Sequence, residues 1–249
     1  IRDPLLNTLV ARPAKEARVV LLTPGPHNET YCEQTYLARY LGYTLVEGQD
    51  LTVRDDRVFL KTLSGLEPVD VILRRVDDDF CDPLELRNDS ILGVPGLVEA
   101  VRAGSGAVAN ALGSGLVQSP ALMPFLPGLC RHLLAEELQL PSVATWWCGQ
   151  KPAREYVVEH LDELLVKPAV RTSQWRFNSD RSSTASDRDA LRRHIEFDPD
   201  LFVAQEQVEF STAPVWEENG LWPRPISMRV FLVASGESYR VMPGGLTRV

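Results

Sequence analysis

The sequence predicts an α/β protein: a Rossmann-like N-terminal half built on a parallel sheet, then an α+β half with an antiparallel sheet. Residues 18–48 read as an apolar strand, a helix and a second apolar strand, and a βαβ unit of this kind makes parallel strands. After residue 200, the segments "FVAQEQVEF", "SMRVFLVA" and "SYRVMP" alternate apolar and polar residues, as antiparallel strands do.

Local signals define the elements of the first half. "RVVLLT" has the length and apolarity of a buried strand. In the helix "TYCEQTYLARYLG", Thr30 and Glu33 match a capping box and Gly42 occupies the usual C-cap position. "LTVRDDRVFL" alternates around Asp55 and Asp56, which predicts a hairpin. "VDVILRR" and "AVANAL" predict further strands, separated by a helix in "PGLVEAVRAG" with proline at its start and glycine after its end.

The second half is predicted to begin after a helical stretch at 120–138, with a boundary near 125–142. A helix at 152–163 precedes the strand "LLVKPA". The serine- and arginine-rich segment 170–189 contains no glycine, and we expect an exposed loop leading into a helix near 188–197. The expected organisation is a leader segment at residues 1–17, an α/β substrate domain at residues 18–125 and a second lobe at residues 126–249.

Composition excludes several classes of protein. A hydrophobic content of 44% in 249 residues permits a sizeable core. The net charge of -8 argues against a general nucleic-acid binder. No apolar run approaches the roughly 18 residues that span a bilayer, and no secretory leader opens the chain. The four cysteines lie far apart without a CxxC motif, so we expect a reduced, cytoplasmic protein without a zinc site.

Polar side chains follow the first and third predicted strands, in "TPGPHNET" and "RRVDDDF". Ligands of open parallel sheets bind at the carboxyl ends of the strands. Three adjacent carboxylates at 77–79 repel one another unless cations compensate them. Two interpretations stay open, an arginine–aspartate surface network and a polar substrate or interdomain pocket. The second gives five candidate substrate-binding residues: His27, Asn28, Glu29, Arg75 and Asp78.

Cations near apolar strands of the second half form another candidate site. Lys167 directly follows a buried strand, and an unpaired buried lysine costs several kcal/mol, so we expect an anion beside it. Arg229 lies within another apolar run and Arg248 near a further one. Three such cations among apolar strands favour a polyphosphate cradle. The strand "AQEQV" offers backbone groups with which adenine could pair.

These stretches, together with "ILGVPGLVEAVRAG", "LPSVATWWCGQ" and "VMPGGLTRV", resemble the circularly permuted ATP-grasp family, type 2, over most of residues 18–249. The branch it resembles is often fused to an alpha-helical "alpha-E" domain. Such proteins are similar to glutathionylspermidine synthetases, so the resemblance implies an ATP-dependent carboxylate–amine ligase acting through an acyl phosphate. The implied substrate is a peptide or an amino-acid-like molecule.

The resemblance also implies that residues 126–249 are a truncated ATP-grasp nucleotide-binding lobe, and it implies roles for individual residues. Lys167 would contact the nucleotide phosphates, and Arg229 and Arg248 would reach the transferred phosphoryl group and act as catalytic residues. The adenine and ribose would be lined by Gln205, Glu206 and Val208. ATP and Mg²⁺ would be the cofactors. The magnesium ligands are expected upstream of Ile1, in a longer polypeptide of which this chain is a fragment, so the isolated chain is expected to be inactive.

The segment after Lys167 departs from the family pattern. ATP-grasp enzymes usually carry a glycine-rich flap there, whereas "AVRTSQWRFNSDRSS" has no glycine. Either Arg171 and Arg176 replace the flap with side-chain cations, or nucleotide binding has decayed. A second hypothesis is therefore a degenerate module that serves as a nucleotide-binding or assembly scaffold without catalysis. A dehydrogenase is excluded because no GxGxxG follows any strand.

Overall fold

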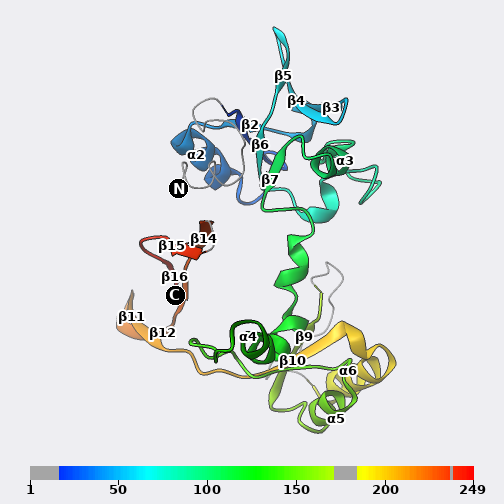
Figure 1. The fold of residues 1–249 in the computed structure, drawn as a ribbon. Helices are drawn as coiled ribbons and strands as arrows, with labels where there is room; N and C mark the ends of the chain where they lie inside the picture. Colours follow the sequence, from blue (N-terminus) through cyan, green and yellow to red (C-terminus); the bar gives the residue numbers. More distant parts are fainter. Residues whose placement is uncertain (1–16, 171–183, 236–237) are drawn as a thin grey trace. The chain divides into compact units, whose positions relative to one another are not determined.

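A computed structural model of the chain describes residues 17–170, 184–235 and 238–249 (Figure 1). The chain forms two compact units. The first comprises the residues up to Ser114 together with Met228–Thr247, and the second comprises Gly115–Ser227 with the last two residues. The predicted roles of residues 18–125 and 126–249 as a substrate domain and a nucleotide lobe stay predictions.

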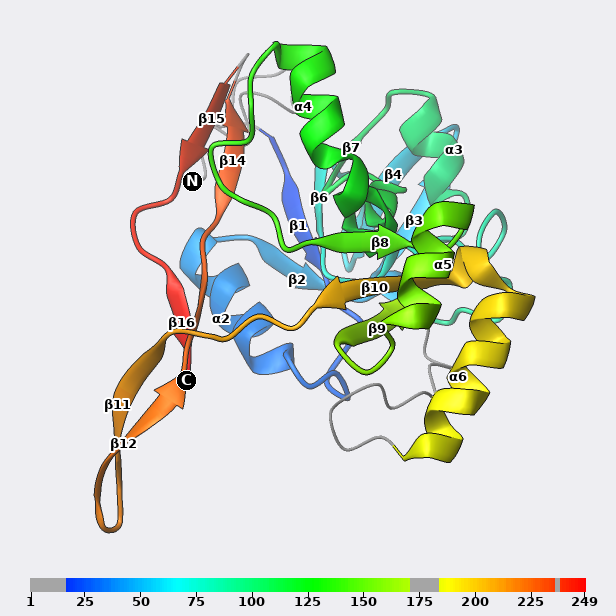
Figure 2. The same cartoon turned by 90° about the horizontal axis from the view of Figure 1, so that it is seen from below.

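The first unit contains the predicted parallel sheet, so the α/β expectation is confirmed. Strands β1 (Val19–Leu22), β2 (Thr44–Val46), β6 (Val71–Arg74) and β7 (Ala107–Ala109) form it in the order β2-β1-β6-β7, and every pairing is parallel. Figures 1 and 2 show helix α2 (Tyr31–Leu41) on one side of this sheet and helix α3 (Leu97–Arg102) on the other.

Alternation along the strands builds the core of the first unit. Val20, Leu22 and Ile72 are almost fully buried on one face of the sheet and pack with Leu97 and Ala100 of α3. The same core receives the meander of β3 (Leu51–Arg54), β4 (Arg57–Thr62) and β5 (Gly65–Pro68). The hairpin predicted at 51–60 is confirmed. Its turn places Asp55 and Asp56 at φ 47° and 56°, in the left-handed region that short aspartate side chains tolerate.

The ends of α2 agree with the sequence at one terminus only. Gly42 is the C-cap at φ 70°, and its N–H donates to the carbonyls of Ala38 and Arg39. The capping box predicted for Thr30 and Glu33 is wrong, because the Thr30 side chain caps no backbone N–H of the helix. Its hydroxyl instead donates to Asn28 Oδ1 in the loop before the helix and accepts from Gln34 Nε2 within the helix.

The second unit is built on a three-stranded antiparallel sheet in the order β8-β10-β9. Its strands are Thr145–Trp147, Phe202–Glu206 and Leu164–Pro168 respectively. Helices α5 (Lys151–Glu159) and α6 (Ala185–Phe197) contribute Val157, Leu191 and Ile195 to a core on one face of this sheet. The helical stretch predicted at 120–138 is divided into a 3-10 helix, η4 (Pro120–Phe125), and α4 (Leu126–Leu134).

Short helices and hairpins complete the described residues. The remaining 3-10 helices are η1 (Gly48–Asp50), η2 (Asp78–Phe80), η3 (Ser114–Gln118) and η5 (Pro199–Leu201). The predicted antiparallel strands after residue 200 are confirmed by β10 and by two largely exposed antiparallel pairs, β11 (Thr212–Glu217) with β12 (Gly220–Pro225) and β14 (Leu232–Ser235) with β15 (Ser238–Val241). Strand β13 (Ser227–Arg229) pairs with β16 (Leu246–Arg248). In the part of the chain that the structure describes, no helix has the length and apolarity to cross a membrane.

One cysteine in each core should report the folding of its own unit. Burial raises the pKa of both the Cys81 and the Cys148 thiol to about 11, so neither forms the reactive thiolate near neutral pH. Cys32 is exposed. We expect iodoacetamide at pH 8 to alkylate Cys32 in the native protein, and to alkylate Cys81 and Cys148 only as urea unfolds their units. Peptide mass spectrometry checks this, and rapid labelling of Cys81 in the native state would contradict the packing described.

Candidate functional site

The carboxyl edge of the parallel sheet is one candidate site. Strand β1 has β2 as its neighbour on one side and β6 on the other, so the chain connections after β1 run in opposite directions across the sheet. Such a point, where the strand order reverses, is where open α/β sheets hold ligands. The loops after β1 and β6 are those singled out from the sequence, so the structure brings the two groups of candidate substrate residues to the same edge.

The loop after β1 is held by a polar network around Gln34, which is 2% exposed. Gln34 Oε1 accepts a 2.5 Å hydrogen bond from Thr23 Oγ1, and its Nε2 donates to Asn28 Oδ1 at 3.1 Å. Asn28 Oδ1 also accepts from the Thr30 N–H. The Asn28 side chain therefore shapes the loop. The side chains of His27 and Glu29 are exposed on it and are free to meet a ligand.

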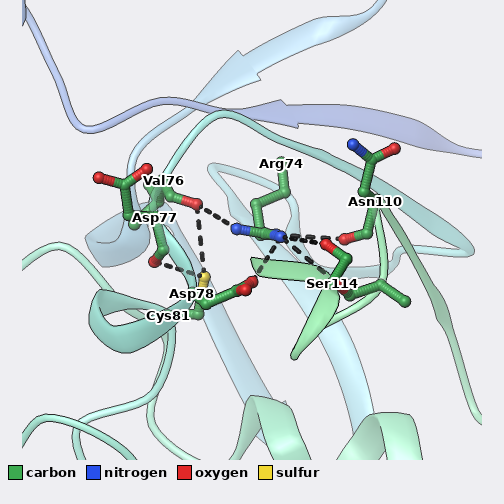
Figure 3. A network of polar contacts seen from close by, with 8 residues as sticks. Arg74, Val76, Asp77, Asp78, Cys81, Asn110 and Ser114 are labelled. Atoms are coloured by element: carbon green, nitrogen blue, oxygen red, sulfur yellow. Dashed lines mark hydrogen bonds and ion pairs between the residues drawn. The ribbon is translucent and has the colours of Figure 1, made fainter. Parts of the chain in front are cut away.

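The loop after β6 is held by Arg74 (Figure 3). Its guanidinium donates to the carbonyls of Val76, Asn110 and Ala111 and to Ser114 Oγ, and pairs with Asp78 Oδ1 at 2.5 Å. An arginine fork of this kind fixes several acceptors at once. The structure therefore supports the network interpretation for Asp78, while the neighbouring Arg75 is exposed at the sheet edge.

The aspartates on either side of Asp78 do not lie on a strand. Strand β6 ends at Arg74, and residues 78–80 form η2 with Asp77 as its N-cap. Both Asp77 and Asp79 are exposed. Within the described ranges, no three histidine, cysteine, aspartate or glutamate side chains cluster as a metal site would require.

Lys167 belongs to the second unit and lies on the face of the antiparallel sheet that points away from the core. Residues directly opposite one another in antiparallel strands share a face, and Lys167 is opposite Val203 while Gln205 is opposite Thr145. The half-buried Lys167 donates from Nζ to Gln205 Oε1 at 2.7 Å. Among the residues placed by the structure, no carboxylate pairs with this ammonium group.

The three predicted adenine-lining residues lie at the end of β10. Gln205 is 7% exposed and its side chain is turned toward Lys167. Glu206 is the last residue of the strand, and its Oε1 accepts from the Ala144 N–H at 3.0 Å. Val208 follows the strand and is half-exposed. All three lie on or just after the strand next to the one that carries Lys167, but only Gln205 shares its face and contacts it, since Glu206 alternates onto the opposite face.

The expectation that Arg229 and Arg248 are tucked among apolar strands is wrong. Arg229 ends β13 and Arg248 ends β16, and both side chains are exposed. The two strands pair with each other, which brings the two arginines onto one short ribbon. Arg229 belongs to the first unit and Lys167 to the second. The segment 171–183, with Arg171 and Arg176, lies outside the described residues.

Sequence reasoning missed two residues of the lysine site, Thr145 and Met123. Gln205 Nε2 donates to Thr145 Oγ1 at 3.0 Å and lies 3.1 Å from Met123 Sδ. Met123 comes from η4, which covers this face of the sheet, where Phe125 also contacts the ring of Trp147. No alternation in "SVATWW" marks Thr145, and its partner strand lies about 60 residues later with a register that the sequence does not show.

A unit with a parallel sheet and a unit with a small antiparallel sheet, which carries Lys167 on its edge strand β9, define a mixed α/β protein. The chain belongs to the family described as circularly permuted ATP-grasp type 2, whose model matches residues 2–249.

Relatives of the chain occur in mycobacteria and cyanobacteria. The protein Rv2411c of Mycobacterium tuberculosis is 38% identical over 244 residues, which cover 98% of this chain and 44% of that protein. The protein sll0335 of Synechocystis is 38% identical over 231 residues, covering 93% of this chain and 48% of that protein. The chain therefore spans less than half the length of these relatives.

Two solved structures align with most of the chain at low sequence identity. The ATP-grasp ligase PsnB complexed with minimal precursor is 15% identical, with a TM-score of 0.47 over 93% of this chain and 75% of that one. D-alanyl-alanine synthetase A from Vibrio cholerae is 10% identical, with a TM-score of 0.41 over 90% of this chain and 73% of that one.

Proposed function

We propose that the chain is part of an ATP-dependent carboxylate–amine ligase that works through an acyl phosphate. The observation that carries the proposal is the Lys167 ammonium, held by the neutral amide of Gln205 on the sheet face that points away from the core. An ammonium group with a neutral partner keeps its full positive charge for a phosphate.

The described residues would divide the work between binding and orientation. Lys167 would donate to the nucleotide phosphates, and the backbone at the end of β10, near Glu206 and Val208, would pair with the adenine edge. Arg229 and Arg248 would be supplied by their exposed ribbon to the transferred phosphoryl group. His27, Glu29 and Arg75, exposed at the carboxyl edge of the parallel sheet, would contact the substrate that carries the carboxylate or the amine.

The proposed reaction needs no co-reactant other than ATP, the carboxylate and the amine. A carboxylate oxygen of the substrate attacks the γ-phosphorus, and the bond to ADP breaks. The amine then attacks the acyl carbon, phosphate leaves with the former carboxylate oxygen, and the amine loses a proton to solvent. Cations near the phosphates stabilise the charge of such a transfer. The described residues contain no group of side chains that would hold Mg²⁺. An alpha-helical domain is the proposed partner of the chain.

A degenerate, non-catalytic scaffold is the second candidate function. It is favoured by the absence of glycine from the sequence 169–183, where the family usually carries a flap over the phosphates. Both candidates agree on the fold and differ in what ATP does. The scaffold would bind a partner without turnover, whereas the ligase would consume ATP only when both the carboxylate and the amine are present.

Binding of ATP to the full-length protein tests the proposal. A ligand that binds only the folded state at one hundred times its dissociation constant stabilises that state by about 2.7 kcal/mol. We therefore expect millimolar ATP with Mg²⁺ to raise the melting temperature, and Mg²⁺ alone to leave it unchanged. An unchanged melting temperature with ATP would reject the ligase and leave the scaffold.

A further inference from the structure

We infer that Gln205 is a positioning residue: it holds the Lys167 ammonium toward the bound phosphates and does not itself contact the nucleotide. The inference rests on the proposed function, because it needs a phosphate ligand at Lys167. It replaces the role that the family resemblance implied for Gln205. The side chain is 7% exposed, and its amide groups are already engaged by neighbours from three other segments of the second unit.

The sheet register places these groups in one row. Gln205 sits opposite Thr145 on β8, and Lys167 on β9 lies diagonally across from it on the same face. Diagonal neighbours of this kind are within reach of long side chains. Three consecutive strands therefore contribute one polar side chain each, and the central one bridges the outer two.

The direction of the hydrogen bonds is fixed from one end of the row to the other. The Thr145 hydroxyl donates its proton to the Val143 carbonyl at 2.8 Å, so toward Gln205 it can only accept. Gln205 must therefore present its NH₂ to Thr145 and its oxygen to Lys167, and an ammonium group is a donor only. The chain of bonds thus runs from Lys167 through Gln205 and Thr145 to the backbone, and the amide cannot flip without breaking it.

The η4 segment also contacts the Gln205 amide and restricts its orientation. Met123 Sδ lies 3.1 Å from Gln205 Nε2, and a thioether is a weak acceptor that suits an NH₂ group. Ser119, at the start of η4, donates from Oγ to the Ala169 carbonyl just after β9 at 2.5 Å, which ties the segment to the strand that carries Lys167. The amide is thus enclosed by both the sheet and η4.

A neutral, fixed acceptor suits a lysine that must bind phosphate. Lysine is among the side chains that lose most rotamer freedom when ordered, and ordering it before the ligand arrives removes that loss from the binding step. Among the described residues, Gln205 takes one of its three N–H groups, which leaves two for phosphate oxygens. A carboxylate in the same place would hold the lysine equally well but would cancel its charge.

A double-mutant cycle in the full-length protein tests the inference by the dissociation constant of the non-hydrolysable analogue AMP-PNP, measured by calorimetry. We expect Gln205→Met to weaken binding about tenfold, the equivalent of one ordinary hydrogen bond. In the Lys167→Met background the same change should have no further effect, because Gln205 acts through the lysine. Gln205→Glu should weaken binding at least as much as Gln205→Met. Thr145→Val should weaken binding about threefold, which is half the loss of binding free energy expected for Gln205→Met. Thr145→Ser keeps the hydroxyl and should leave the dissociation constant unchanged.

Each outcome bears on a different claim. If the wild type does not bind the analogue, or if Lys167→Met binds as tightly as the wild type, the proposed function fails. If Lys167→Met weakens binding but Gln205→Met does not, the inference is overturned while the function stands. An equal loss from Gln205→Met in both backgrounds would show a purely structural role and would overturn it too. Should Gln205→Met fail to fold, the Thr145→Val and Thr145→Ser pair decides between the same outcomes.

Discussion

Replacing Lys167 with methionine in the full-length protein is expected to weaken ATP binding about 100-fold, since hydrogen bonds to charged groups contribute about 1.5–3 kcal/mol. Methionine keeps the length and the apolar stem of lysine and removes only the ammonium group. The fold should persist, because the side chain is half-buried on the face opposite the core of the second unit. Calorimetric titration with AMP-PNP measures the effect, and the turnover of ATP should fall with it.

Lys151→Met is the matched control. Lys151 belongs to the same unit, and replacing it removes the same single positive charge. Its side chain is exposed on α5, with Nζ 3.8 Å from Glu155 Oε1. Exposed ion pairs of this kind contribute little. Binding should be unchanged in this variant. Equal affinities for Lys167→Met and Lys151→Met would remove the basis for a nucleotide site on this sheet.

Gly93→Ala is expected to lower the free energy of unfolding of the first unit by about 3 kcal/mol, because overpacking against rigid atoms is among the costlier substitutions. A Cβ at Gly93 would lie 2.3 Å from the Phe80 carbonyl oxygen and 2.6 Å from the Cys81 carbonyl. The backbone of Gly93 is also close to Gly48, where an added Cβ would lie 2.4 Å from the Gly93 oxygen. Backbone atoms on both sides cannot give way as a flexible side chain would.

Gly106→Ala is the control for this prediction. A Cβ there would meet only the Val69 and Asp70 carbonyl oxygens, at the ordinary contact distance of 3.7 Å. Urea unfolding followed by alkylation of Cys81 reports the first unit alone, and alkylation of Cys148 reports the second. Gly93→Ala should shift the Cys81 transition to lower urea, whereas Gly106→Ala should not. A wild-type Cys81 transition in Gly93→Ala would show that the two backbone segments can separate at little cost.

The parallel sheet was predictable because its signals are local. Apolar runs of strand length alternate with a helix, and the residues at the turn and helix end, Asp55, Asp56 and Gly42, need only their neighbours to act. The capping box was wrong for a related reason. The Thr30 hydroxyl donates to Asn28, and its oxygen accepts from the Gln34 side chain instead of from a backbone N–H of the helix.

The candidate site was predictable in part. The position of Lys167 at the end of a buried strand is local information, but its partner Gln205 lies 38 residues later on a strand whose register the sequence does not show. Arg229 was misplaced because "SMRVFLVA" reads as one buried strand. In the structure it is divided between β13 and β14, whose residues are largely exposed. Apolar composition indicates a strand more reliably than it indicates what covers it.

The anchoring of the two loops at the reversal of the strand order has a consequence for the divergence of these proteins. Each loop is secured by its own residues, Gln34 for one and Arg74 for the other, and these anchors point into the framework. The outward side chains, such as His27 and Arg75, contribute little to that framework. Under the proposed function, replacing them would change which substrate is bound without a matching loss of stability.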